Sequence, residues 1–182
     1  MPVLTTSRLT CSPLQAEDWP FYLSLQQQPE VMRYVCDARP VALIREAFEP
    51  RLQPWTPGSA HWLCLVVRDT ASQTALGMTG YIHRDVDCAE VGFLFAPQAQ
   101  GQGYGYESLR ALCDYAFEQG SIRRLTATVT AGNKASRGLL EKTGFILEGE
   151  LRDNFFLAEA WHNDWLFGLL KREYQANQPP FG

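Results

Sequence analysis

The sequence lacks several features that would assign it to a class at once. No apolar run is long enough to span a bilayer, and the N-terminal segment has no apolar core of the kind found in signal peptides. The five cysteines are odd in number and form no C-x-x-C pair, which favours free thiols in a reducing compartment. The three histidines lie far apart, so we expect no metal site. These absences predict a cytoplasmic protein without a membrane anchor or a bound metal.

Strong charge of one sign is also absent. The 182 residues carry 16 basic and 20 acidic side chains, and the basic ones are dispersed, so we expect no nucleic-acid partner. Hydrophobic residues make up 46% and charged residues 20%, which is typical of a globular chain. The length suits one domain, which we place at residues 1–174. A tail over residues 175–182 contains two prolines and is expected to be disordered.

Alternation and helical periodicity predict a definite order of elements. We expect strands over residues 8–14, 61–68, 75–84, 88–96, 123–130, 145–152 and 160–170, with a loop over 153–159. We expect helices over residues 16–27, 30–34, 41–51, 104–118 and 133–143. This order predicts an α+β fold with a mixed, mostly antiparallel sheet of six to seven strands flanked by helices.

A glycine-rich stretch between a predicted strand and a predicted helix is the most informative segment. Residues 93–107 read FLFAPQAQGQGYGYE, with Gly101, Gly103 and Gly105 at alternate positions. Glycine amides are not obstructed by a Cβ atom, and the first amides of a helix have no internal partner. Such a loop can bind phosphate or pyrophosphate. The spacing matches neither the dinucleotide motif GxGxxG nor the P-loop, so a plain turn between strand and helix is the competing interpretation.

Two blocks of the sequence resemble the GNAT superfamily of N-acetyltransferases. Residues 100–105 (QGQGYG) are similar to its Q/R-x-x-G-x-G/A acyl-CoA loop. Residues 133–149 are similar to the N-x-x-S…E-K-x-G-F…E-G block of its Rim-type branch, the ribosomal-protein N-terminal acetyltransferases and their relatives. Weaker similarities extend the resemblance over nearly the whole chain. It implies the single-domain acyl-CoA N-acyltransferase fold.

The resemblance also implies the reaction and its partners. Acetyl-CoA would be the co-substrate, and its acetyl group would pass directly to a primary amine. The acceptor is either the α-amine of a protein N-terminus or a small-molecule amine, and the sequence does not choose between them. Family members are often dimers, which favours a homodimer.

The family pattern assigns the co-substrate to particular residues of this chain. The backbone of Phe93 and Phe95 would bond the pantetheine arm where two strands diverge, and Asn133 would bond it from the other side. Ser136 would lie near the thiol. The pyrophosphate would be held by the amides of a loop and first helical turn formed by Gln100, Gly101, Gln102, Gly103, Tyr104, Gly105 and Tyr106.

The catalytic residues are less well determined by the pattern. Many superfamily members use a tyrosine as the acid, but the equivalent position here is Leu140, so the resemblance assigns that role to Ser136. Glu90 is the first candidate for the base, with Asp153 and His83 as alternatives. Two structural interpretations compete with these roles: Glu90 pairs with a neighbouring side chain, and Asn133 simply caps the helix that follows it.

Two other classes of protein would share part of this pattern. A non-catalytic acyl-CoA sensor would keep residues 100–105 but would need neither acid nor base. A nucleotide-binding protein could use the same loop, but residues 133–145 would then have no explanation.

Overall fold

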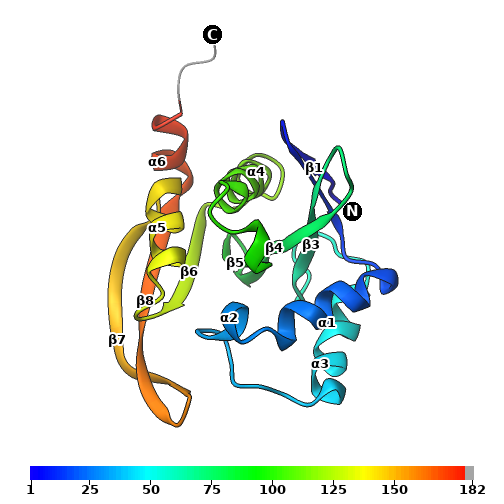
Figure 1. Cartoon of the computed structure of the whole chain (residues 1–182). Helices are drawn as coiled ribbons and strands as arrows, with labels where there is room; N and C mark the ends of the chain where they lie inside the picture. Colours follow the sequence, from blue (N-terminus) through cyan, green and yellow to red (C-terminus); the bar gives the residue numbers. More distant parts are fainter. Residues whose placement is uncertain (179–182) are drawn as a thin grey trace.

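The computed structural model describes residues 1–178 and contains one eight-stranded sheet (Figure 1). The strand order is β1-β2-β3-β4-β5-β6-β8-β7. All neighbours are antiparallel except β5 and β6, which are parallel. The strands are β1 (Leu4–Thr5), β2 (Leu9–Pro13), β3 (Leu63–Asp69), β4 (Ala75–Asp85), β5 (Cys88–Phe95), β6 (Arg124–Thr130), β7 (Ile146–Leu157) and β8 (Ala160–Leu170).

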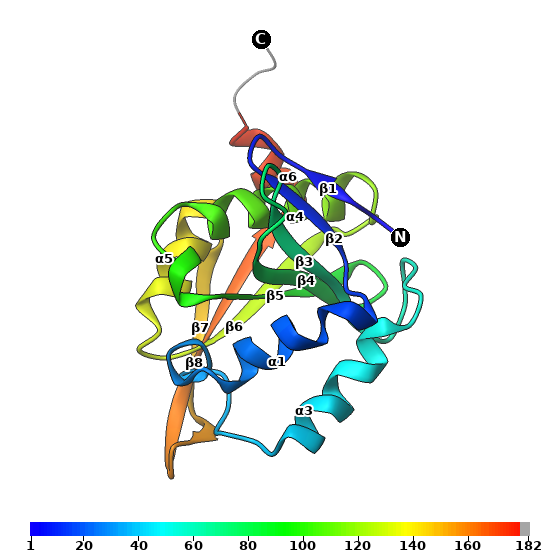
Figure 2. The same cartoon turned by 45° about the vertical axis from the view of Figure 1, so that its right-hand side comes forward.

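Helices cover both faces of the sheet (Figures 1 and 2). They are α1 (Trp19–Gln27), α2 (Pro29–Met32), α3 (Val41–Phe48), α4 (Tyr104–Glu118), α5 (Lys134–Thr143) and α6 (Lys171–Ala176), with short 3-10 turns at Ala16–Asp18, Glu49–Leu52 and Pro97–Ala99. One apolar cluster joins the sheet to α4, and a second joins the opposite face of β3 and β4 to α1 and α3. The sheet therefore separates two hydrophobic cores.

Local sequence signals explain the two helices that flank the gap between β5 and β6. Helix α4 begins after Gly103, whose φ of 81° suits glycine, and it buries an apolar face that includes Leu109 and Leu112. Helix α5 is capped by Asn133 and ends at Gly144, which has a φ of 109°. Both helices occupy the ranges expected from the sequence.

The gap between β5 and β6 is the feature that positions the site. The two strands pair at Cys88–Arg124, Ala89–Leu125 and Glu90–Thr126, and β5 then diverges while β6 continues beside β8. The backbone of Phe93 and Phe95 is therefore paired with β4 on one side and open on the other. This is the open strand edge that the family resemblance implied.

Several predicted boundaries are wrong. Strand β1 makes the sheet eight-stranded, and β7 continues through most of the loop expected at 153–159. Strand β7 continues there because it pairs with β8. The φ angle of Asp153 is 47°, which interrupts the regular register, and the Asp153 amide donates instead to Asn163 Oδ1 at 2.9 Å. Helix α6 extends two residues into the expected disordered tail, and residues 179–182 of that tail lie outside the described residues.

Candidate active site

The glycine loop adopts the conformation that its composition predicts. Gly101 and Gly103 have φ values of 74° and 81°, a region that side chains with a Cβ atom rarely enter. The first helical hydrogen bond of α4 runs from the Glu107 amide to the Gly103 carbonyl at 3.0 Å. The amides of the preceding first turn are therefore free of intrahelical partners and lie at the positive end of the helix dipole. This end of α4 can bind an anion.

An ion pair between Arg8 and Glu107 supports the glycine loop. Arg8 donates to Glu107 Oε2 at 2.7 Å and to the Gln102 carbonyl at 3.0 Å. Partial burial alone would raise the pKa of Glu107, but hydrogen bonds from Thr6 and Arg8 outweigh it and hold that pKa below its ordinary value. The negative charge of Glu107 is thus compensated by Arg8, which also bonds the loop at Gln102.

A large cleft runs along the loop and α5. Its volume is about 1220 Å³. It is lined by nearly all the residues that the resemblance assigned to the co-substrate, namely Phe93, Phe95, Gln100, Gly101, Gly103, Tyr104, Gly105, Tyr106, Asn133 and Ser136. Gln102 does not line it, because its side chain turns back to the Gln98 carbonyl at 2.7 Å. The cleft has the size and the free amides that an acyl-CoA molecule requires.

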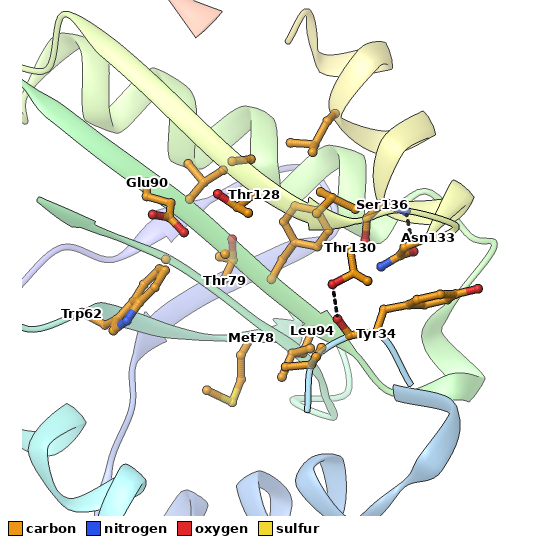
Figure 3. A pocket seen from close by; sticks show the side chains of 18 of the residues that line it. Tyr34, Trp62, Met78, Thr79, Glu90, Leu94, Thr128, Thr130, Asn133 and Ser136 are labelled. Atoms are coloured by element: carbon orange, nitrogen blue, oxygen red, sulfur yellow. Dashed lines mark hydrogen bonds between the residues drawn. The ribbon is translucent and has the colours of Figure 1, made fainter. Parts of the chain in front are cut away.

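A second cavity of about 390 Å³ opens where β5 and β6 diverge (Figure 3). Its walls are mostly apolar and aromatic, and its charged lining residues are Arg51, Glu90 and Asp164. The Trp62 ring packs against Gly92, where an added Cβ atom would approach it to 3.1 Å. This cavity has the size and lining of a small-molecule site.

The two cavities meet at one place. Both are lined by Tyr34, Val35, Phe93, Leu94, Asn133 and Ser136. The Thr130 hydroxyl donates to the Tyr34 carbonyl at 3.0 Å and so fixes this segment over the end of β6 (Figure 3). A molecule in the large cleft and a molecule in the small cavity would touch at this junction.

Ser136 and Asn133 lie together at the junction. Asn133 Oδ1 accepts the Ser136 amide at 3.2 Å, so Asn133 is the cap of α5 and also lines both cavities (Figure 3). The residue one turn after Ser136 is Leu140, which is fully buried and offers carbon alone. Ser136 therefore supplies the hydroxyl on this helix that faces the junction.

Glu90 is paired with a neighbouring side chain and also lines the small cavity, so its role as the base stays a prediction. Its carboxylate lines the small cavity, and Arg84 Nε also donates to it at 2.8 Å. The other base candidates lie elsewhere. Asp153 lines neither cavity, and neither does His83, whose Nε2 accepts the Gly58 amide and whose ring stacks on Trp55.

The sequence reasoning missed two polar residues of the small cavity. Thr79 is 3% exposed and its hydroxyl has no hydrogen-bond partner within residues 1–178. Asp164 is 6% exposed and lies on β8. A sequence signal exists for Asp164, since it is the one charged residue within the otherwise apolar and polar-neutral strand Ala160–Leu170.

The cavity also contains a thiol, that of Cys64. Burial raises the pKa of this thiol to about 12, so it is not an available thiolate at neutral pH. Within the described residues, no group of three or more metal-ligating side chains is found, and no helix is long and apolar enough to cross a membrane.

Comparison with known families decides what this arrangement is. The sequence model of the Acetyltransferase (GNAT) domain matches residues 8–146. The chain belongs to the GNAT family. As a member of this family, the protein has the acyl-CoA N-acyltransferase fold. It is an N-acetyltransferase that uses acetyl-CoA as co-substrate. Both conclusions agree with the prediction from the sequence resemblance. The match covers the family as a whole and does not single out the Rim-type branch.

Individual relatives agree with this assignment. A Bacillus licheniformis protein named uncharacterized N-acetyltransferase p20 is 29% identical over 178 residues, covering 96% of this chain and 99% of its own. The structure of a spermidine N-acetyltransferase from Vibrio cholerae, in complex with CoA and spermine, superposes with a TM-score of 0.81 at 23% identity, covering 93% of this chain and 99% of that one. A GNAT-family acetyltransferase from Bacillus anthracis superposes with a TM-score of 0.82 at 20% identity, covering 94% and 100%.

Proposed function

We propose that the protein transfers an acetyl group directly from acetyl-CoA to a primary amine held in the 390 Å³ cavity. The observation that carries the proposal is the junction of the two cavities at Phe93, Asn133 and Ser136. A thioester at the end of the large cleft and an amine in the small cavity would be brought together there, which supplies proximity and orientation.

The co-substrate would be bound mainly by backbone groups. Free amides at the start of α4 suit the pyrophosphate, and the open edge of β5 at Phe93 and Phe95 suits the amides of the pantetheine arm. An N–H group of this open edge could also donate a hydrogen bond to the thioester oxygen as negative charge develops there.

Ser136 and Glu90 are the proposed acid and base. The neutral amine nitrogen attacks the thioester carbonyl carbon, the C–S bond breaks, and the departing sulfur takes the hydroxyl proton of Ser136, which is replaced from water. The amine proton passes to Glu90 through water. A lysine-type amine with a pKa of about 10.4 needs more help than an α-amine with a pKa of about 8. The buried, protonated state of Cys64 supports direct transfer over a cysteine-bound intermediate.

The identity of the amine acceptor, and with it membership of the Rim-type branch, is the second part of the proposal. The small cavity is large enough for a compact amine or for the first residue of a peptide, but not for a folded chain end. A Rim-type enzyme would take a protein N-terminus, whereas the mainly apolar walls suit a small amine equally well.

A homodimer is proposed from exposed apolar side chains at the sheet edge. Phe156 on β7 and Trp161 on β8 are 53% and 59% exposed and pack against each other at the turn between these strands. Ile146 and Leu151 are also exposed and extend this apolar surface along β7. We expect sedimentation equilibrium to give a dimer for the natural protein and a monomer for Trp161→Ser; a natural monomer would remove this part of the proposal.

One experiment tests the function as a whole. Thermal stability is measured with acetyl-CoA, CoA, ATP and NAD, and thiol release is followed with a panel of amines and peptides. A ligand that binds the folded state alone at 100 times its Kd raises stability by about 2.7 kcal/mol. Stabilisation by CoA with thiol release for one acceptor is the expected result. Stabilisation without release for any acceptor would favour the acyl-CoA sensor, and stabilisation by ATP or NAD alone would favour the nucleotide-binding alternative.

A further inference from the structure

The three charged residues of the small cavity differ in how their charges are compensated. Glu90 is paired with Arg84, whereas Arg51 forms no ion pair within the described residues and its guanidinium donates to the Ala47 carbonyl. Asp164 Oδ2 accepts one hydrogen bond, from Asn154 Nδ2 at 2.8 Å. Within residues 1–178, no basic side chain forms an ion pair with Asp164. One carboxylate of the cavity therefore has no positive partner from the described chain.

Such a carboxylate is unfavourable unless something compensates it. Asp164 is 6% exposed, and removal of an ionised carboxylate from water is costly when a neutral amide is its sole partner. A cationic ligand in the cavity would supply the missing charge. The carboxylate would then be stabilised in the complex, which makes it a recognition group for positive charge.

A second residue indicates independently that the cavity receives a polar ligand. The Thr79 hydroxyl is buried, lines the same cavity and has no partner within the described residues. Buried hydroxyls are normally hydrogen-bonded, so an unsatisfied one in a cavity wall is a contact point for a ligand. Thr79 lies on β4, far from Asp164 in the sequence, so the two observations do not share a cause.

Strand register places Asp164 beside the junction of the two cavities. Asp164 is paired with Thr130 across β6 and β8, and the Asn133 amide donates to the Thr130 carbonyl. Glu90 is paired with Thr126, four residues earlier on β6, which corresponds to about 13 Å along the strand. Thr126 and Thr130 face the same side, so the two carboxylates lie at separate places of one cavity and can serve separate roles.

We propose that Asp164 binds the acceptor amine in its protonated, ammonium form, before its proton is lost, and so makes the cavity selective for a compact, cationic amine. The inference rests on the proposed amine acetylation and concerns binding alone. Thr79 adds a hydrogen bond to the same ligand, and the apolar walls contact its carbon body. Asp164 is thus a specificity-determining residue, distinct from the acid and base at Ser136 and Glu90.

The direct test compares a cationic ligand with its neutral isostere. Benzylamine and benzyl alcohol have nearly the same shape, and each is added to the natural protein with saturating CoA while the thermal midpoint is followed. We expect benzylamine to stabilise the protein and benzyl alcohol to have little effect. Asp164→Asn should treat the two ligands alike. Equal stabilisation of the natural protein by both ligands would overturn the proposal.

Kinetics give the second readout. For an acceptor that releases thiol, Asp164→Asn should raise the acceptor KM at least tenfold and leave the KM for acetyl-CoA within twofold. Asp153→Asn is the matched control, because it removes the same charge from a nearby carboxylate outside the cavity, at a positive φ that asparagine tolerates. An unchanged acceptor KM in Asp164→Asn would show a purely structural role.

The two proposals fail in different ways. If no acceptor releases thiol, amine acetylation is rejected, while the ligand pair still reports on Asp164. If Asp164→Asn does not fold, the ligand pair is compared between the natural protein and Glu90→Gln, which keeps Asp164 and should still be stabilised by benzylamine alone; loss of that preference would overturn the role of Asp164. If thiol is released but neutral and cationic ligands bind equally, amine acetylation stands and the role of Asp164 is rejected.

Discussion

The two cavities that meet at Ser136 offer different kinds of group to a ligand. The large cleft offers backbone amides, two glycines in left-handed conformations and an open strand edge. The small cavity offers side chains such as Trp62, which precedes β3, Thr79 on β4 and Asp164 on β8. The first site should therefore be sensitive to an added Cβ atom, and the second to exchange of one polar side chain for another.

The largest effect should come from a Cβ atom in the glycine loop. Gly103 has a φ of 81° and comes immediately before the first turn of α4, so Gly103→Val would change the direction of the free amides. Each charge-assisted hydrogen bond contributes about 1.5–3 kcal/mol, so loss of two should weaken CoA binding at least about 100-fold. Isothermal titration with CoA measures this.

Gly58→Val is the control for backbone strain. Gly58 has a φ of 91°, and its added Cβ atom would meet nothing within 4 Å. It should lower the thermal midpoint about as much as Gly103→Val while CoA affinity is retained. Equal loss of CoA affinity in both variants would show that the loop is not a specific site.

The next effect concerns the hydroxyl at the junction. Ser136→Ala removes the hydroxyl but keeps the amide that Asn133 caps, so α5 should stay folded. Acid catalysis of this kind contributes about 100-fold or more, and we expect kcat to fall by about that factor with CoA affinity unchanged. Ser24→Ala, on the exposed side of α1, is the control. A kcat within twofold of the natural enzyme would remove Ser136 from the chemistry.

Substitutions of Glu90 and Arg84 test whether Glu90 acts as a base or only as the partner of an ion pair. Glu90→Gln should lower kcat at least about tenfold, because the amine proton then has no carboxylate acceptor. Arg84→Gln leaves the carboxylate in place and should keep kcat within about twofold, since partly exposed ion pairs contribute little. If both variants lose activity equally, pairing and not proton transfer is what matters at Glu90.

The smallest expected effect is the loss of the stability that the ion pair between Glu107 and Arg8 contributes. The pKa of Glu107 is lowered in the folded state, so its contribution to stability is present above its unfolded pKa of about 4.3 and is lost as pH falls through the folded value. Glu107→Gln should therefore lower the thermal midpoint by roughly 2 °C at pH 7, and the difference should disappear near pH 3. A constant difference across this range would contradict the assignment.

The same contrast explains what the sequence could predict. The large cleft is built mainly from two contiguous segments, Gly101 to Gly105 and Asn133 to Ser136. Each segment has a local backbone conformation that its own sequence determines. The residues of these two segments that the resemblance assigned to the co-substrate line the large cleft, apart from Gln102, and their binding of the co-substrate stays a prediction. Which amide meets which phosphate stays a prediction.

The acceptor half depends on register between strands that are distant in the sequence. Thr79 lies opposite Phe93, and Asp164 lies opposite Thr130, but no local pattern fixes either pairing. Asp153 and His83 were considered because carboxylates and imidazoles are chemically suitable, and the structure places both outside the cavities. Composition identifies candidate groups, whereas tertiary pairing selects among them.

The divergence of β5 from β6 has a consequence for the cohesion of the folded state. Three residue pairs alone join these strands, so the sheet consists of two panels, β1–β5 on one side and β6, β8 and β7 on the other. Few backbone bonds resist separation of the panels, and local opening should be easiest along this line. A pantetheine arm bonded to the edge of β5 would bridge them and slow amide hydrogen exchange in both strands. One hydrophobic core spans both panels and holds them in one domain, and an occupant of the gap would add a second link between them.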